Sequence, residues 1–154
     1  MALDQFTTVA LTRAEAGFAN NANVTDPVIQ VFVDAANGEV ASNLSNRYYL
    51  PLSNNTNYAS SLTESYLKQL TTNLAAGLLL LRQYEGMGGD MDDLALAKIQ
   101  SSRSQLREIQ KGERILVGSD GSPLLAVSAG SNSISGHPNN TTERTNRVGI
   151  NDVF

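Results

Sequence analysis

The stretch from residue 58 to residue 89 constrains the fold more than any other part of this 154-residue chain. Large apolar side chains recur there at three- and four-residue steps, the spacing of one face of an α-helix. The stripe consists of Tyr58, Leu62, Tyr66, Leu70, Leu74, Gly77, Leu78, Leu81 and Tyr84. Leu67, Leu79 and Leu80 widen it until little of its C-terminal half is left for water, and the glycines after Glu85 end the helix. The pattern predicts a central helix, covered by the rest of the subunit or by a neighbouring one.

An earlier helix is predicted over residues 26–46. Thr25 or Asp26 can cap it, and Pro27 suits its first turn because a proline there loses no helical hydrogen bond. Its apolar positions are Val28, Phe32, Ala35, Ala36, Val40 and Leu44. Gly38 either permits a close helix crossing, the interpretation we favour, or weakens the helix by about 1 kcal/mol relative to alanine.

A third helix is predicted over residues 90–111, with acidic side chains in the first turn, where the helix dipole favours negative charge. Two short β-type runs then follow, at 114–117 and 124–127, around a turn that contains Asp120-Gly121. We therefore expect a mainly α protein, a small bundle of about three main helices with a short β-hairpin.

The expected organisation is an N-terminal segment (1–24), a helical bundle with the hairpin (25–127) and an extended C-terminal arm (128–154). The arm is low in large apolar residues until its last seven positions. It then ends in an apolar hook formed by Val148, Ile150, Val153 and Phe154. Such an arm fits a segment that orders on a partner; the alternative is a disordered terminus with chance hydrophobic residues.

No catalytic, cofactor-binding or metal-binding group emerges from the sequence. The chain has no cysteine, and its one histidine, His137, has no second histidine or cysteine to complete a site. The stretch GMGGDMDD lacks the Gly-Lys-Ser/Thr ending of a phosphate-binding loop, and a helix end followed by an acidic helix start explains it. We expect a non-enzymatic protein that needs no cofactor.

Charge and hydropathy disfavour three further classes: nucleic-acid-binding, exported and membrane proteins. The net charge is −4 and the 11 basic residues are scattered, so tight nucleic-acid binding is not expected. The N-terminus lacks a basic lead followed by an apolar core, and the longest apolar run is too short to span a bilayer. We expect a protein that is neither exported nor inserted in a membrane.

One short signature stands out from this background, the turn Asn-Arg-Tyr-Tyr-Leu-Pro-Leu at residues 46–52. Tyr48, Tyr49, Leu50 and Leu52 place four large side chains directly behind Arg47, where a surface turn is normally small and hydrophilic. We expect Arg47, Tyr48, Tyr49, Leu50 and Pro51 to form a structural turn. The turn follows a helix with apolar residues at Val33, Ala36, Val40 and Leu44, and precedes the Leu-rich helix that ends in Arg-Gln-Tyr-Glu.

This order of elements over residues 26–127 resembles the tailed-bacteriophage head–tail connector (adaptor, or head-completion) proteins. The resemblance implies a helical bundle that forms a ring, usually of twelve copies, between the portal protein and the neck or tail. Double-stranded DNA passes through the channel of such a ring without specific binding, and mild negative charge suits that role. The implied location is the head–tail interface of the virion, reached from the host cytoplasm during assembly.

The resemblance also assigns roles to particular residues. It implies that the C-terminal arm contacts the portal through Val148, Ile150, Val153 and Phe154. The tyrosines of the turn either both fold back onto the bundle, or one packs inside while the other lies in a subunit interface. The family pattern accounts neither for the length of the segment before Thr25 nor for the arm after Gly130.

Two other functions remain as alternatives. One is a tail-completion or neck protein one layer below the connector, although such proteins tend to be richer in strands. The other is a small helical binding or regulatory module, which would need a basic recognition face or a pocket with converging polar groups.

Overall fold

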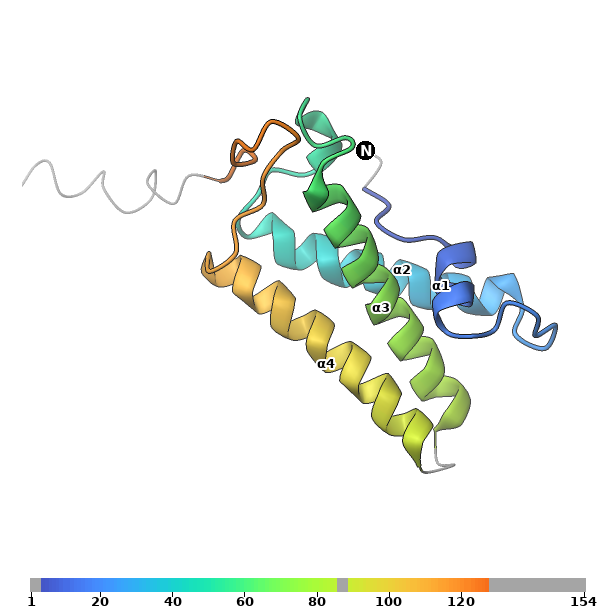
Figure 1. The fold of residues 1–154 in the computed structure, drawn as a ribbon. Coiled ribbons are helices and arrows are strands. Elements are labelled where there is room, and N and C mark those ends of the chain that lie inside the picture. The colour runs from blue at the N-terminus through green and yellow to red at the C-terminus, as the bar shows by residue number, and fades with distance from the viewer. Residues whose placement is uncertain (1–3, 86–88, 128–154) are drawn as a thin grey trace, which may run out of the picture.

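The computed structural model describes residues 4–85 and 89–127, which form a bundle of helices (Figure 1). The elements are α1 (Val9–Glu15), α2 (Asp26–Ser45), the short 3-10 helix η1 (Leu52–Asn54), α3 (Leu62–Tyr84) and α4 (Asp90–Lys111). The three long helices lie where the sequence predicts them. The prediction of a mainly α bundle is confirmed, and no described helix is long and apolar enough to cross a membrane.

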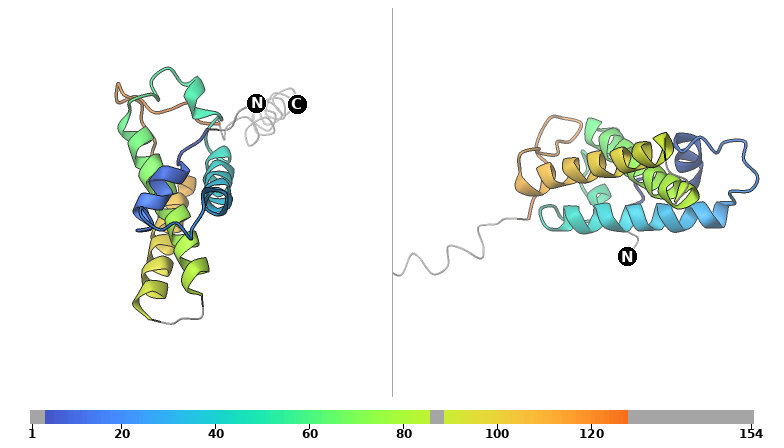
Figure 2. Two further views of the ribbon diagram at one scale, coloured as in Figure 1. Left: turned by 90° about the vertical axis from the view of Figure 1, so that its right-hand side faces the viewer. Right: turned by 90° about the horizontal axis from the view of Figure 1, so that it is seen from below.

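The Leu-rich helix α3 is the central element, as predicted. It runs antiparallel to α4, while α2 crosses α3 and also contacts α4, and α1 packs against α3 and α2 (Figures 1 and 2). Leu67, Leu74 and Leu79 are fully buried along α3. The predicted stripe begins too early, however, because Leu62 is 84% exposed at the first position of α3 and Tyr58 lies in the preceding turn.

A glycine-mediated close crossing exists, but not at the position favoured from the sequence. A Cβ atom on Gly77 would lie 2.9 Å from Ile99 Cγ1 and 3.0 Å from the carbonyl oxygen of Ala95, so this glycine lets α3 and α4 approach closely. A Cβ atom on Gly38 would meet nothing within 4 Å. The close-crossing interpretation of Gly38 is therefore wrong, because this glycine lies on the exposed side of α2.

The N-terminal segment contains a helix that the sequence pattern did not predict. Thr8 caps α1 by accepting a hydrogen bond from the Leu11 amide. Just before the helix, the Asn37 side-chain oxygen on α2 accepts hydrogen bonds from the amides of Phe6 (2.9 Å) and Thr7 (3.2 Å). Phe6 is buried in the main core, so this segment belongs to the bundle rather than lying outside it.

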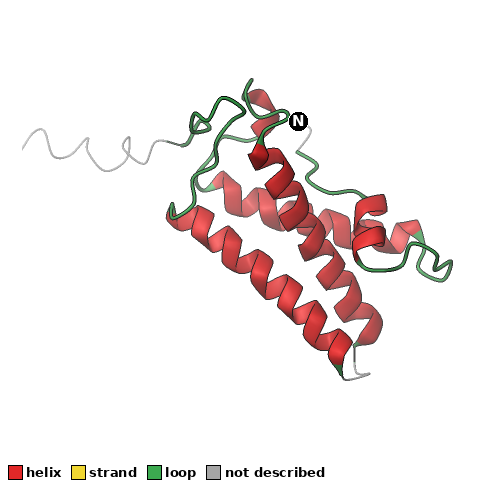
Figure 3. Ribbon diagram, viewed as in Figure 1, coloured by secondary structure: helices red, strands yellow, loops and turns green. Residues whose placement is uncertain are grey.

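The predicted hairpin does not form a β-ladder within residues 114–127, and no strand is assigned to the described part of the chain (Figure 3). The segment turns back on itself through one isolated bridge between Val117 and Pro123. The Leu116 amide, which would donate back to Leu124 in a continued ladder, donates to the Tyr48 hydroxyl instead. Beyond Leu124 the chain pairs with the turn after α2.

Candidate partner-binding surface

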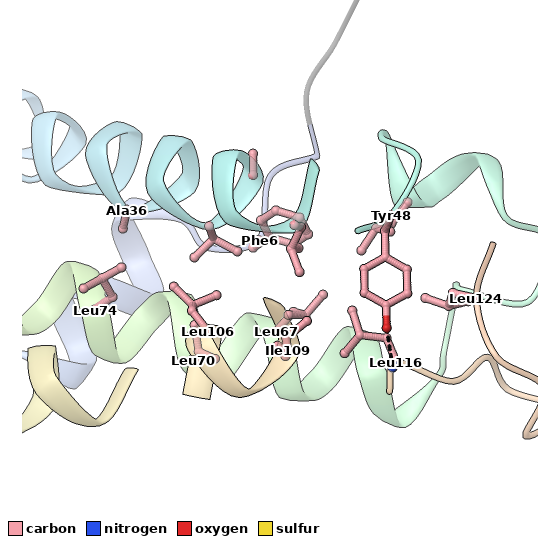
Figure 4. Packing of buried hydrophobic residues seen from close by; sticks show 14 of the residues in the cluster. Phe6, Ala36, Tyr48, Leu67, Leu70, Leu74, Leu106, Ile109, Leu116 and Leu124 are labelled. Carbon is pink, nitrogen blue, oxygen red and sulfur yellow. Dashed lines mark hydrogen bonds between the residues drawn. The ribbon is translucent and has the colours of Figure 1, made fainter. Parts of the chain in front are cut away.

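Tyr48 anchors the turn that follows α2. Its side chain is only 2% exposed and points into the main core, among leucines of α3 and of the C-terminal segment (Figure 4). The hydroxyl oxygen accepts a hydrogen bond of 3.0 Å from the backbone amide of Leu116, which is also buried. One side chain therefore joins the end of α2 to the chain beyond α4, at a separation of 68 residues.

The backbone around Tyr48 pairs with residues 125–127. The Tyr49 amide donates to the Leu125 carbonyl (3.4 Å), and the Val127 amide donates to the Arg47 carbonyl (2.7 Å). These bonds flank an antiparallel bridge between Tyr48 and Ala126. Since successive side chains of extended backbone point to opposite faces, burial of Tyr48 directs Tyr49 outward, opposite Leu125.

The outer face of this pairing carries a cluster of exposed apolar side chains. Tyr49 is 57% exposed, Leu125 67% and Val127 39%; we call these three residues the Tyr49 surface. Single exposed apolar residues are ordinary, but a contiguous group points to a binding surface. Of the two expectations for the tyrosine pair, packing of both is wrong: Tyr48 packs inside and Tyr49 is exposed.

Arg47 borders the Tyr49 surface. Its guanidinium group lies so close to Gly112 that a Cβ atom there would be about 2.5 Å from it. Gly112 ends α4 with a positive φ of 81°, a conformation that glycine adopts readily, and its lack of a Cβ atom leaves room for the guanidinium group. The Arg47 Nε atom is buried without a hydrogen-bond partner, and no carboxylate of the described chain forms an ion pair with this arginine.

The rest of the turn is held from the N-terminal side. Leu50 packs against the core, Pro51 follows a cis peptide bond, and Leu52 is fully buried at the start of η1. The Asp4 carboxylate accepts hydrogen bonds from the Leu52 amide and from the Ser53 hydroxyl (2.8 Å). A carboxylate at the start of a helical turn satisfies amide groups that the turn itself leaves free.

The turn around Asp120 is bonded to the loop between η1 and α3. The Asp120 carboxylate accepts hydrogen bonds from the Ser122 hydroxyl (2.6 Å) and amide (3.0 Å), and from the Asn57 side chain (2.7 Å). The bonds from Ser122 hold the pKa of Asp120 below its usual value. The Asp120 carboxylate is therefore occupied by protein donors that hold the predicted turn.

An open pocket of about 340 Å³ lies next to this turn. It is bordered by Asn54, Asn55, Thr56, Asn57, Ser122, Pro123, Leu124 and Leu125. Asn55 donates its side-chain amide to the Leu52 carbonyl and accepts from the Leu125 amide, so its polar atoms serve the loop itself. The pocket is continuous with the Tyr49 surface through Leu125.

The ionisable groups with shifted pKa values elsewhere are explained by packing. Burial raises the pKa of Tyr58, and nearby carboxylates add to the effect. Burial also raises the pKa of Tyr66, against the opposing charge of Arg114, whose guanidinium lies 4.9 Å from the ring centre. Arg103 is paired with Glu39 across α2 and α4, and this hydrogen bond raises the pKa of the arginine. Arg103 and Glu39 both line an open pocket of about 320 Å³, where they are paired with each other.

Several predicted residues fall outside the described part of the chain. They are the hook residues Val148, Ile150, Val153 and Phe154, together with His137. Within the described ranges, no group of three or more histidine, cysteine or acidic residues is placed to hold a metal ion. The sequence pattern did not predict that Leu125 and Val127 belong to the Tyr49 surface, because it assigned them to a strand of the hairpin. The available signal was the continuous apolar run from Leu124 to Val127, since apolar and polar residues alternate in a half-buried strand.

Comparison with known proteins adds no assignment, because no family model, curated protein or solved structure matches this chain.

Proposed function

We propose that this protein is a connector (adaptor) subunit of a tailed bacteriophage. It forms a ring that joins the portal to the neck or tail and extends the DNA channel. The proposal starts from the signature at residues 46–52 and from the order of helices around it. It places the protein at the head–tail interface of the virion, with the portal protein, a neck or tail protein and further copies of itself as partners.

The observation that carries this proposal is the difference in burial between Tyr48 and Tyr49. Tyr48 is buried and fixes the position of the turn, which leaves Tyr49 exposed beside Leu125 and Val127. Three exposed apolar side chains at one place form a surface that a partner can cover. A ring subunit needs such a surface, because each copy presents one patch to the preceding neighbour and another to the following one.

The charge of the chain is compatible with the role. A net charge of −4 disfavours adhesion of DNA to the channel wall. Basic side chains of α4 are partly neutralised by ion pairs, as in the pair of Arg103 with Glu39 on α2. In this proposal the hook residues bind the portal protein; they are Val148, Ile150, Val153 and Phe154.

The test is the mass of the purified protein in solution, alone and mixed with the portal protein encoded by the same genome. The expected result is a portal-bound complex whose added mass is a whole-number multiple of 16.5 kDa. A protein that shows no affinity for that portal would overturn the proposal. A matched variant that lacks Val153 and Phe154 tests the arm: unchanged portal binding would remove the arm contact and leave the connector role intact.

A further inference from the structure

The Tyr49 surface lies next to the point where the described chain ends. Val127 belongs to this surface and is also the last described residue. The sequence continues for 20 residues, 128–147, that contain one large aliphatic side chain, Ile134. The apolar hook at 148–154 then follows. An exposed apolar surface and a separate apolar segment are thus joined by a short polar connection.

We propose that the hook of the same chain covers the Tyr49 surface in the free protein. The two parts are complementary in kind. The surface presents one aromatic and two aliphatic side chains, and the hook offers Val148, Ile150, Val153 and Phe154. Val148 and Ile150 are spaced two residues apart, so extended backbone would direct both toward the surface.

Charge complementarity supports the same pairing. Arg47 borders the surface without an ion-pair partner in the described chain, and its buried Nε atom has no hydrogen-bond acceptor. The hook contains one acidic residue, Asp152, between its apolar anchors. A carboxylate that reaches the guanidinium group of Arg47 would give this arginine the ion-pair partner that the described chain does not supply.

The free backbone edge at Ala126 gives the hook a place to pair. In the bridge with Tyr48, the hydrogen bonds run through the amides of Tyr49 and Val127, so the amide and carbonyl of Ala126 point away from the turn. No backbone partner for Ala126 is present in the described chain. An extended segment can add to such an edge while its side chains settle on the neighbouring face.

The length of the polar connection over residues 128–147, called the tether below, favours binding of the chain's own hook over the hook of a second copy. A polar connection of this length keeps an attached segment at an effective concentration on the order of millimolar. At micromolar protein, the hook of another molecule is about a thousandfold more dilute than this. On the proposed function, the portal then takes the hook and leaves the Tyr49 surface to the adjacent subunit; only this last step rests on that function.

The absence of cysteine from the chain makes a direct test possible. The parent variant carries Leu125→Cys and Asn151→Cys, which keeps the other surface residues and all four hook anchors. The matched control adds Val148→Ser and Ile150→Ser, so the tether and both cysteines are unchanged. Disulfide formation is followed at micromolar protein, and circular dichroism checks that both variants are folded.

The expected result is an intramolecular disulfide that forms about tenfold faster in the parent than in the control, because docking adds to the tether effect. Equal rates would show that the tether alone brings the cysteines together and would overturn the proposal. Disulfide-linked dimers would overturn it in favour of a second copy. The measurement contains no portal, so its outcome is separate from that of the connector assignment.

Discussion

The hydrogen bond between Tyr48 and the Leu116 amide is expected to contribute measurably to stability, and Tyr48→Phe tests it. The substitution retains the buried ring and removes only the oxygen that accepts the 3.0 Å bond. Tyr48 and Leu116 are each 2% exposed, so water cannot replace the lost acceptor. A buried amide left without a partner costs roughly 1–3 kcal/mol.

Urea unfolding followed by circular dichroism measures this loss. With a slope of about 2 kcal/mol per molar urea, a loss of about 2 kcal/mol lowers the midpoint by about 1 M. The matched control is Tyr49→Phe, whose side chain is 57% exposed and makes no side-chain hydrogen bond in the described chain. Its effect is expected to stay within about 0.5 kcal/mol. Equal midpoints for the two variants would refute the assignment of Tyr48 as the anchor of the turn.

The remaining predictions concern a pair of glycines and one carboxylate. Gly77→Ala places a methyl group 2.9 Å from its nearest neighbour, so we expect about 1–3 kcal/mol of destabilisation, while Gly38→Ala fills open space and is expected to stabilise by up to about 1 kcal/mol. Thermal unfolding of the two variants checks this, and shifts of the same sign would contradict it. Ser122→Ala removes a hydrogen bond that lowers the pKa of Asp120, so the pKa is expected to rise toward its usual value in an NMR titration. The pKa of Asp120 is lower in the folded protein than in the unfolded chain. Its carboxylate therefore stabilises the fold above the unfolded pKa, and this stabilisation is lost as the pH falls through the folded pKa. An unchanged pKa of Asp120 in the variant would show that the Ser122 hydroxyl does not lower it.

The long helices could be predicted because their signals are local. Thr25, Asp26 and Pro27 mark the start of α2, and Gly112 ends α4 in the left-handed conformation that suits glycine. The seven-residue helix α1 gave no comparable signal. Isolated helices of this length are unstable in water, and α1 forms where Asn37 holds the preceding backbone and Thr7 bonds to Thr72 on α3.

The candidate surface could be predicted only in part. The signature at residues 46–52 directed attention to the correct turn, and the size of its side chains indicated that the turn was held to something. Leu125 and Val127 were assigned to a hairpin, because their spacing about an Asp-Gly turn is typical of one. Their exposure follows from pairing with residues 47–49, a long-range contact that carries no periodic trace in the sequence.

The sequence by itself determined the number of long helices, their approximate bounds and the central place of the Leu-rich one, because hydrophobic spacing and capping residues act over one or two turns. Only the tertiary structure decided which glycine lies at the α3–α4 crossing and which tyrosine of the pair is buried. Both choices depend on what stands opposite a residue in space. Gly77 meets Ile99 and Ala95, whereas Gly38 meets nothing, and Tyr48 finds the amide of Leu116 while Tyr49 is left at the surface.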